Sequence, residues 1–336
     1  MSKSGQSNKN KKFVKSSRRL LLLILFFVFL LLTFGVFTYS WFSSNKNALI
    51  DTIDINVATV TGLQVSVDAI NWANEVSREE LENAINTYSG AENQFPDTLA
   101  GVSTDGSVSN GKLNMYYGIT TEDSDGEYSL TTVKQTEKNC VGDEECEHRH
   151  YVAYDLFLLV TTPADIAITA NSGIGPQEDA EDKGSQNAAR IGFVVLGTVD
   201  ANASAYAAQS IKSGRTSYIW EPNYDMHTEH AVKAAKKYYN IDTTTSGGAR
   251  LPYKGVNQEF SSSVRLDQTG NSPYFTTVTP DIATISGFTN NQALMRIPAG
   301  ITKVRVYLWL EGQDVDMENY AASSKLKFDL ELAMVS

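Results

Sequence analysis

The sequence predicts an all-β fold, a jelly-roll-like β-sandwich with short helical insertions, that follows an N-terminal transmembrane helix. Three observations support this fold class. An unbroken apolar run lies near the N-terminus, many short segments beyond it alternate between apolar and polar residues, and the segments with helical spacing are short. Alternating strands separated by Gly, Asn and Asp turns are typical of antiparallel sheets that pack on one face.

The apolar run is Leu20–Phe37, which contains no charged side chain. At about 1.5 Å per residue a helix of this length spans roughly 27 Å, close to the bilayer's hydrocarbon core of about 30 Å. The preceding tail, residues 1–19, is rich in Lys and Arg and has no acidic residue, so the positive-inside rule places it in the cytoplasm. We therefore expect residues 20–42 to form a single-pass transmembrane signal anchor and residues 43–336 to form one extracellular domain.

A cleaved secretory leader is the alternative to a retained anchor. The tripeptide that ends at Ser40 resembles a small-x-small cleavage site, and cleavage near Ser40 would secrete the protein. Tyr39, Trp41 and Phe42 instead match the aromatic belt at the headgroup level of a membrane, which favours an uncleaved anchor. Both alternatives place residues 43–336 outside the cell membrane.

The charge balance limits the partners of the exported part. The chain carries 28 basic and 39 acidic residues, and seven of the basic residues lie in the cytoplasmic tail, so the remainder is strongly acidic. Such a surface repels polyanions, which argues against nucleic acid as a partner and against binding to anionic lipid.

Nine segments rich in β-branched and apolar residues are predicted to be strands. In the last two of them, aliphatic residues alternate with polar or aromatic ones, as at Arg305, Tyr307 and Trp309. We therefore expect each of these two strands to bury its aliphatic face and to expose the other face to water. The nine segments are Thr52–Val60, Leu63–Val67, Tyr151–Thr161, Ile166–Ala170, Arg190–Leu196, Ser217–Trp220, Phe275–Val278, Lys303–Leu310 and Lys325–Val335.

Three short helices are predicted as insertions between strands. Ser77 and Glu80 form a capping-box pattern, followed by apolar residues at helical spacing, which predicts a helix over residues 78–88. Residues 203–211 and residues 228–239 are the other candidates, and lysines near the carboxyl end of the third favour its helix dipole. None of the three is long or apolar enough to define the fold.

The two cysteines, Cys140 and Cys146, lie in the acidic segment KNCVGDEECEHRH. A cell-surface location permits a disulfide between them, which would close a short local loop and contribute on the order of 2–3 kcal/mol. The alternatives are free thiols or a metal site built with His148 and His150, although the C-x5-C-x-H-x-H spacing matches no common zinc pattern.

Three stretches carry a resemblance to a known family. They are TYSWF at 38–42, GLQVSVD at 62–68 and VRVYLWLEGQDVD at 304–316, the last of which is followed by a final strand at Lys325–Leu332. With these stretches the chain resembles the exported Gram-positive surface proteins related to TasA and camelysin, with a leader of the SipW-dependent type. The resemblance implies a jelly-roll ectodomain, export by a dedicated signal peptidase in some relatives, and assembly into surface or biofilm matrix filaments by strand exchange between subunits.

No catalytic or cofactor motif is found, since G-x-S-x-G, P-loop and H-E-x-x-H patterns are all lacking. We therefore predict no enzymatic activity and no cofactor. Two acidic loops are weak calcium candidates, because carboxylates are the ligands that calcium prefers, and solvated acidic turns are the alternative. His227 and His230 lie one helical turn apart and are a further metal candidate, with two surface histidines as the alternative. The weak calcium candidates are Asp123, Asp125, Glu127, Asp314, Asp316 and Glu318.

The sequence therefore predicts a non-enzymatic bacterial cell-surface protein with a structural, matrix or adhesive role. The segment just outside the membrane is the candidate for strand exchange with a neighbouring subunit, and pairing within its own domain is the alternative. Its apolar strand-exchange candidates are Ile50, Ile53, Ile55 and Val57.

Two other functions stay open. The domain could be an extracellular glycan- or protein-binding module, with an exposed Trp72 or Trp220 as its anchor, and packing of these aromatic rings in a sheet core is the more common alternative. A secreted hydrolase is the more remote alternative, because it needs a base or a metal group that the four histidines do not visibly supply.

Overall fold

A computed structural model describes residues 50–60, 62–122, 124, 128–265, 273–317 and 324–335. The chain divides into two units, Met1–Ser40 and Trp41–Ser336, and all described residues belong to the second. The predicted membrane segment Leu20–Phe37 and its basic tail lie outside the described residues. Among the helices that are described, none combines the length and the apolar character needed to cross a membrane.

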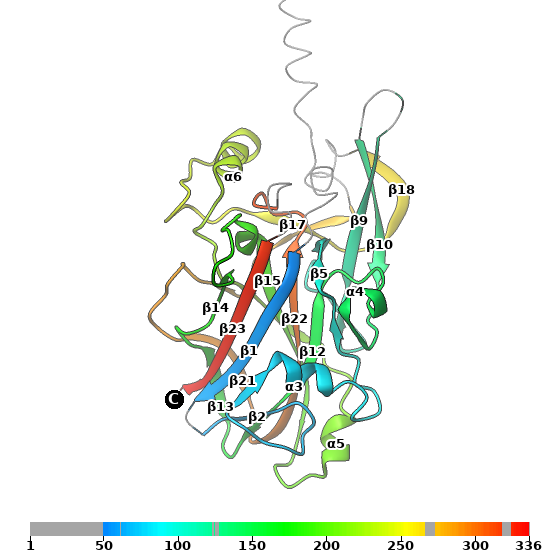
Figure 1. Cartoon of the computed structure of the whole chain (residues 1–336), viewed down its shortest axis with the longest axis vertical. Helices are drawn as coiled ribbons and strands as arrows, with labels where there is room; N and C mark the ends of the chain where they lie inside the picture. The colour runs from blue at the N-terminus through cyan, green and yellow to red at the C-terminus, as the bar shows by residue number, and fades with distance from the viewer. Residues whose placement is uncertain are drawn as a thin grey trace, which may run out of the picture. The chain divides into compact units, whose positions relative to one another are not determined.

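The described part is mostly β, with mixed sheets and short helices (Figure 1), which confirms the all-β prediction at this level. The smaller main sheet, sheet A, has the order β21-β13-β23-β1-β3, with β14 paired to β23 and β5 paired to β1. Its seven strands are β1 (Ile50–Val60), β3 (Glu75–Ser77), β5 (Thr98–Leu99), β13 (Ala164–Ile168), β14 (Gly173–Pro176), β21 (Gln292–Ile297) and β23 (Ser324–Val335).

The larger sheet, sheet B, has the order β11-β4-β12-β22-β6-β9-β10-β18, with β15, β16, β20 and β2 attached beside this path. Its long central strand β22 pairs with both β12 and β15 in antiparallel register. The twelve strands are β2 (Gln64–Ser66), β4 (Gln94–Phe95), β6 (Gly101–Ser103), β9 (Met115–Glu122), β10 (Tyr128–Gln135), β11 (Cys140–Val141), β12 (Val152–Val160), β15 (Ala189–Val199), β16 (Thr216–Glu221), β18 (Phe260–Arg265), β20 (Ile282–Ala283) and β22 (Gly300–Glu311).

Two small two-stranded sheets complete the strands. They are β7 (Val108–Ser109) with β8 (Lys112–Leu113), and β17 (Tyr253–Val256) with β19 (Phe275–Val278). All nine predicted strand segments coincide with described strands, with ends that shift by a few residues.

The main core lies between sheets A and B. Ile55 and Val57 of β1, and Phe328 and Leu330 of β23, belong to one buried cluster with apolar residues of β12 and β22, among them Val306. In Figure 1, β23 and β1 run side by side in front of β22 and β15. Each buried aliphatic side chain contributes roughly 1.5–3 kcal/mol of hydrophobic free energy, so this cluster holds the two sheets together.

The predicted wet face of Lys303–Leu310 is wrong. Every residue of β22 is buried, including Arg305, Tyr307 and Trp309. The reason is a second layer: Leu113 of β8, Met115 of β9 and other apolar residues pack on the outer face of β22 with Tyr307 and Trp309. The alternation predicted for Lys325–Val335 is confirmed, since its aliphatic residues are buried and its lysines are exposed.

The three predicted helices are present. The first two are shorter than expected, whereas the third is helical over nearly its predicted length, as α6 (Glu229–Ala234) followed by the π-helical η2 (Ala235–Tyr239). α3 (Arg78–Asn83) has the predicted capping box, in which the Ser77 backbone N–H donates to Glu80 Oε2 over 2.8 Å. It ends before residue 88 because Asn86 adopts a left-handed conformation, φ 66°, which a continuing helix does not allow. The other helical segments are α4 (Gly142–Glu145), α5 (Ala205–Gln209) and the 3-10 turn η1 (Ser185–Ala188).

Cys140 and Cys146 form a disulfide across α4. Their sulfurs are therefore not available as metal ligands, and the metal site with His148 and His150 is not formed. His148 is exposed, while the ring of His150 stacks on Tyr117 at a centroid distance of 4.1 Å. Because disulfides persist in oxidising compartments, this bond supports an extracellular location for the domain.

Candidate functional site

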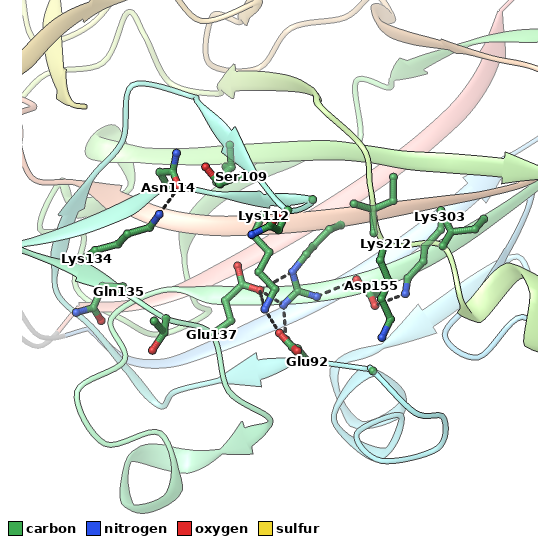
Figure 2. Close-up of a pocket in the computed structure, with 18 residues that line it drawn as sticks. Glu92, Ser109, Lys112, Asn114, Lys134, Gln135, Glu137, Asp155, Lys212 and Lys303 are labelled. Carbon is green, nitrogen blue, oxygen red and sulfur yellow. Dashed lines mark hydrogen bonds and ion pairs between the residues drawn. The ribbon is translucent and has the colours of Figure 1, made fainter. Parts of the chain in front are cut away.

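A cavity of about 420 Å³ lies on the outer face of sheet B. Its lining comes from the β7–β8 pair, from the end of β10 and the residues after it, from β12 and from β22 (Figure 2). The strand pairing explains why charged residues meet here: Asp155 of β12 lies directly opposite Arg305 of β22 in the antiparallel register. Side chains alternate along a strand, so Lys303 and Arg305 point to the same face.

Five ion pairs link three cations and three carboxylates of this lining into one network. Arg305 lies at its centre. Its Nη1 contacts Asp155 Oδ1 at 2.8 Å, and its Nη2 contacts Glu137 Oε2 at 2.6 Å. Lys303 Nζ contacts Asp155 Oδ2 at 2.9 Å, and Lys112 joins the network through Glu137 and Glu92.

Two tyrosine hydroxyls satisfy the remaining acceptor positions of the buried carboxylates. Tyr88 donates to Asp155 Oδ2 over 2.7 Å, and Tyr307 donates to Glu137 Oε1 over 2.7 Å. The Tyr307 oxygen in turn accepts from the backbone N–H of Leu113 over 3.1 Å. Such complete pairing is needed because an unpaired buried charge costs several kcal/mol.

The network fixes its own charge state. Burial raises the pKa of Asp155, but Arg305 and Lys303 outweigh that effect, and the pKa lies below its ordinary value. Burial lowers the pKa of Lys303 and that of Lys112, an effect that the nearby carboxylates only partly offset. Glu137 and Asp155 are each held by two cations, which makes them poor general bases.

Two further lysines of the lining stand apart from this network. Lys134 Nζ donates to Asn114 Oδ1 over 2.6 Å, and neither Lys134 nor Lys212 forms an ion pair with any residue that the structure describes. Figure 2 shows Lys134 at one end of the cavity, beside Asn114, and Lys212 at the other end, beside Lys303 and Asp155. The cavity lining therefore carries two positive charges more than its carboxylates balance.

A second buried charge cluster lies where β15, β16 and the loop after β22 meet. Arg190 Nη2 pairs with Glu221 Oε1 at 2.7 Å and also with Asp314. Arg250 Nε contacts the other oxygen of Glu221 at 2.8 Å. The Asp314 carboxylate is thus bound by an arginine, which leaves it unsuited to a calcium ion.

Asp316 is also engaged with protein groups. Its Oδ2 lies 2.8 Å from His227 Nδ1, and its Oδ1 accepts from the backbone N–H of Thr228 over 2.7 Å. His227 is buried and not a surface residue, whereas His230 is exposed, so the two histidines do not share a site. Within the described ranges, no group of three or more His, Cys, Asp or Glu residues is arranged to hold a metal ion. The other calcium candidates, Asp123, Asp125, Glu127 and Glu318, lie outside the described residues.

The tryptophan anchors proposed for a binding module are not exposed as expected. Trp220 is fully buried in the main core and its Nε1 donates to Thr284 Oγ1 over 3.1 Å, so for this residue the alternative of core packing holds and an exposed anchor is excluded. Trp72 is half-buried and packs against a small cluster that includes Phe157. Trp220 lies in strand β16, whereas Trp72 lies in the loop between β2 and β3.

The strand-exchange segment is paired within its own domain. β1 runs parallel to β23, with Ile53 opposite Leu326 and Val57 opposite Leu330. Ile55 and Val57 are buried in the main core. The side chains of Ile50 and Ile53 lie outside the described set, although their backbones are paired.

No family model, no curated protein and no solved structure matches the chain. The resemblance to exported surface proteins therefore stays a prediction.

Sequence reasoning missed the cavity network. One signal was present: Asp155 is a lone charge inside the apolar strand YVAYDLFLLV, and a lone charge in a buried strand requires a buried partner. Arg305 was recognised but assigned to a wet face. Glu137 stands 168 residues from its partner Arg305, and no local pattern indicates such a pairing.

Proposed function

We propose that this chain is a non-enzymatic bacterial cell-surface protein with a structural or adhesive role in an extracellular matrix. In this proposal Leu20–Phe37 anchors the protein in the membrane, or is removed by cleavage near Ser40, and the two packed sheets form a jelly-roll-like ectodomain. Subunits associate when β1 of one chain replaces β1 of a neighbour beside β23.

The position of β1 is the observation that carries the proposal. β1 is the first described strand and pairs along most of its length with β23, near the other end of the chain. Its other partners, β3 and β5, pair with it over only three and two residues. β1 comes before every other described strand of the domain, so it can leave the sheet without threading those strands, which favours exchange over that of a strand from the middle of the domain.

The energetics of exchange are close to balanced. If β1 left its place, β23 would expose one row of backbone hydrogen-bonding groups, and Ile55 and Val57 would leave the core. A second copy of β1 restores the same pairs and the same buried side chains. Exchange therefore costs mainly a barrier and the loss of translational freedom, and high local concentration on a surface favours it.

Cysteine cross-linking tests this proposal on the full-length protein. Asn56 of β1 lies opposite Asp329 of β23, and both side chains are half-buried at the sheet surface. A double variant, Asn56→Cys with Asp329→Cys, should form an internal disulfide in dilute protein and thus verify the register. The two single variants are then mixed and concentrated, and a disulfide-linked heterodimer is expected because only exchange brings the two cysteines together.

Asn56→Cys mixed with Tyr206→Cys is the matched control, since Tyr206 is exposed on α5 and does not pair with β1. Heterodimer formation no greater than in this control, or a protein that stays monomeric at high concentration, would overturn the exchange mechanism.

A further inference from the structure

We propose that the cavity between β10, β12 and β22 binds a hexuronate, the carboxylate form of a sugar acid, either free or as a unit of an acidic polysaccharide. This inference goes beyond the proposed structural role and does not depend on strand exchange. It rests on the charge, the polar lining and the size of the cavity.

The charge of the cavity selects an anion. Lys112, Lys303 and Arg305 are matched by three carboxylates, whereas Lys134 and Lys212 are not matched by any described acid. The chain as a whole has a formal net charge of −11, so this hollow has the opposite sign to its surroundings. A concave site of one sign concentrates the opposite ion, and the acidic exterior lowers competition from broad, non-specific anion binding.

The arrangement of the two lysines favours carboxylates over a single compact dianion. Lys134 and Lys212 stand at opposite ends of the cavity in Figure 2, so their charges do not converge on one point. Arg305 gives its guanidinium to Asp155, Glu137 and the Glu92 carbonyl, so its fork is not available for a phosphate. One sugar carboxylate can pair with one of the two lysines, and a chain of two acidic sugar units can pair with both.

The neutral part of the lining suits hydroxyl groups. Side chains of Ser109, Asn110, Asn114 and Thr136 line the cavity and can each donate and accept hydrogen bonds. The lining therefore offers neutral polar side chains beside its lysines, as a ligand with both hydroxyl groups and a carboxylate requires.

The remaining wall is apolar, formed by Leu113, Leu196 and Ile211, and can cover the C–H face of a sugar ring. The cavity volume of about 420 Å³ falls within the usual range of small-molecule sites, about 300–1,000 Å³. The buried network below it is fully paired, so its groups are held in place before a ligand arrives, which reduces the entropy lost on binding.

Calorimetry on the full-length protein at low salt tests the assignment, with D-glucuronate as the probe and D-glucose as its neutral counterpart. We expect saturable binding of glucuronate, at least about ten-fold tighter than that of glucose, because one charge-assisted contact is worth about that factor. The double variant Lys134→Gln with Lys212→Gln should lose about ten-fold in affinity for glucuronate and little for glucose. An oligouronate is titrated in parallel: tighter binding than the monomer indicates a polysaccharide unit, and equal binding indicates the free acid.

The matched control is Lys233→Gln with Lys236→Gln, which removes the same charge from the exposed α6–η2 segment outside the cavity. It should leave glucuronate binding unchanged. Absence of glucuronate binding, equal affinity for glucose, or an equal loss in both double variants would overturn the proposal. Because the measurement uses unassembled protein, its failure leaves strand exchange untouched, and the cross-linking result leaves this site untouched.

Discussion

Replacement of Arg305 by Met should destabilise the protein by about 3–5 kcal/mol, the range for removing one partner of a buried ion pair. Arg305 is 3% exposed and contacts two carboxylates and one backbone carbonyl. Met fills much of the aliphatic volume, so the loss comes mainly from the charge and not from a cavity. The variant leaves Asp155 and Glu137 buried with less compensation.

The remaining partners set the expected size of the effect. Asp155 keeps Lys303 and the Tyr88 hydroxyl, and Glu137 keeps Lys112 at 3.5 Å. This residual pairing places the expected loss near 3 kcal/mol, the lower end of the range. A loss of that size is a large fraction of a typical total stability of about 5–15 kcal/mol.

Urea unfolding followed by tryptophan fluorescence measures the loss, since Trp220 and Trp309 are fully buried. The control is Arg296→Met, which removes an exposed pair with Asp165, where the side chains are 69% and 42% exposed. Exposed pairs contribute about 0–1 kcal/mol. If the two variants lost the same free energy of unfolding within about 1 kcal/mol, the assignment of Arg305 to a buried network would be refuted.

Two further variants probe the end of β22 and the contacts of the loop that follows it. His227→Ala removes the contact with Asp316 that holds the segment of α6 and η2. It should therefore speed tryptic cleavage at the lysines of this segment by roughly five- to a hundred-fold. The control variant His230→Ala should leave the cleavage rate unchanged. Glu311→Gln should change the pH dependence of stability. Burial raises the pKa of Glu311 from 4.5 to about 7, so the folded state holds a proton that the unfolded state releases. Wild-type stability should therefore fall as the pH rises from about 4.5 to 7, and the Gln variant, which lacks this decline, should exceed it above pH 7 by on the order of 2–3 kcal/mol. Urea titrations at pH 5 and pH 8 decide this, and parallel pH curves for the two proteins would contradict it.

The long central strands of the two packed sheets, such as β12 and β23, were predictable because their signal is local. Alternation at Leu326, Phe328 and Leu330, or a continuous apolar run such as Val152–Val160, needs no knowledge of the partner strand. The β9–β10 pair was missed because its strands lack such a local signal. Its sequences, MYYGITTE and YSLTTVKQ, are rich in Thr and Tyr but have no clean apolar face, and pairing between the two strands defines them more than burial does.

The outer face of β22 depends on tertiary structure that alternation along the strand does not encode. Alternation at Arg305, Tyr307 and Trp309 predicts two chemically different faces, and the structure has two different faces. It does not predict whether the polar face meets water or a second protein layer. That layer is built from residues about 150–190 positions away, so only tertiary structure reveals that the arginine needs two buried carboxylates.

The two proposals use separate parts of the fold, and this separation is itself a physical argument for their compatibility. β1 belongs to sheet A and contributes no residue to the described lining of the cavity, which lies on the far side of β22. The buried charge network ties β12, β22 and the segment after β10 together within sheet B. A change in the pairing of β1 therefore leaves the cavity and its network in place. A surface protein built in this way would expose one identical, positively charged cavity on every subunit, so that association of subunits would multiply its affinity for a repetitive acidic polymer without any new contact.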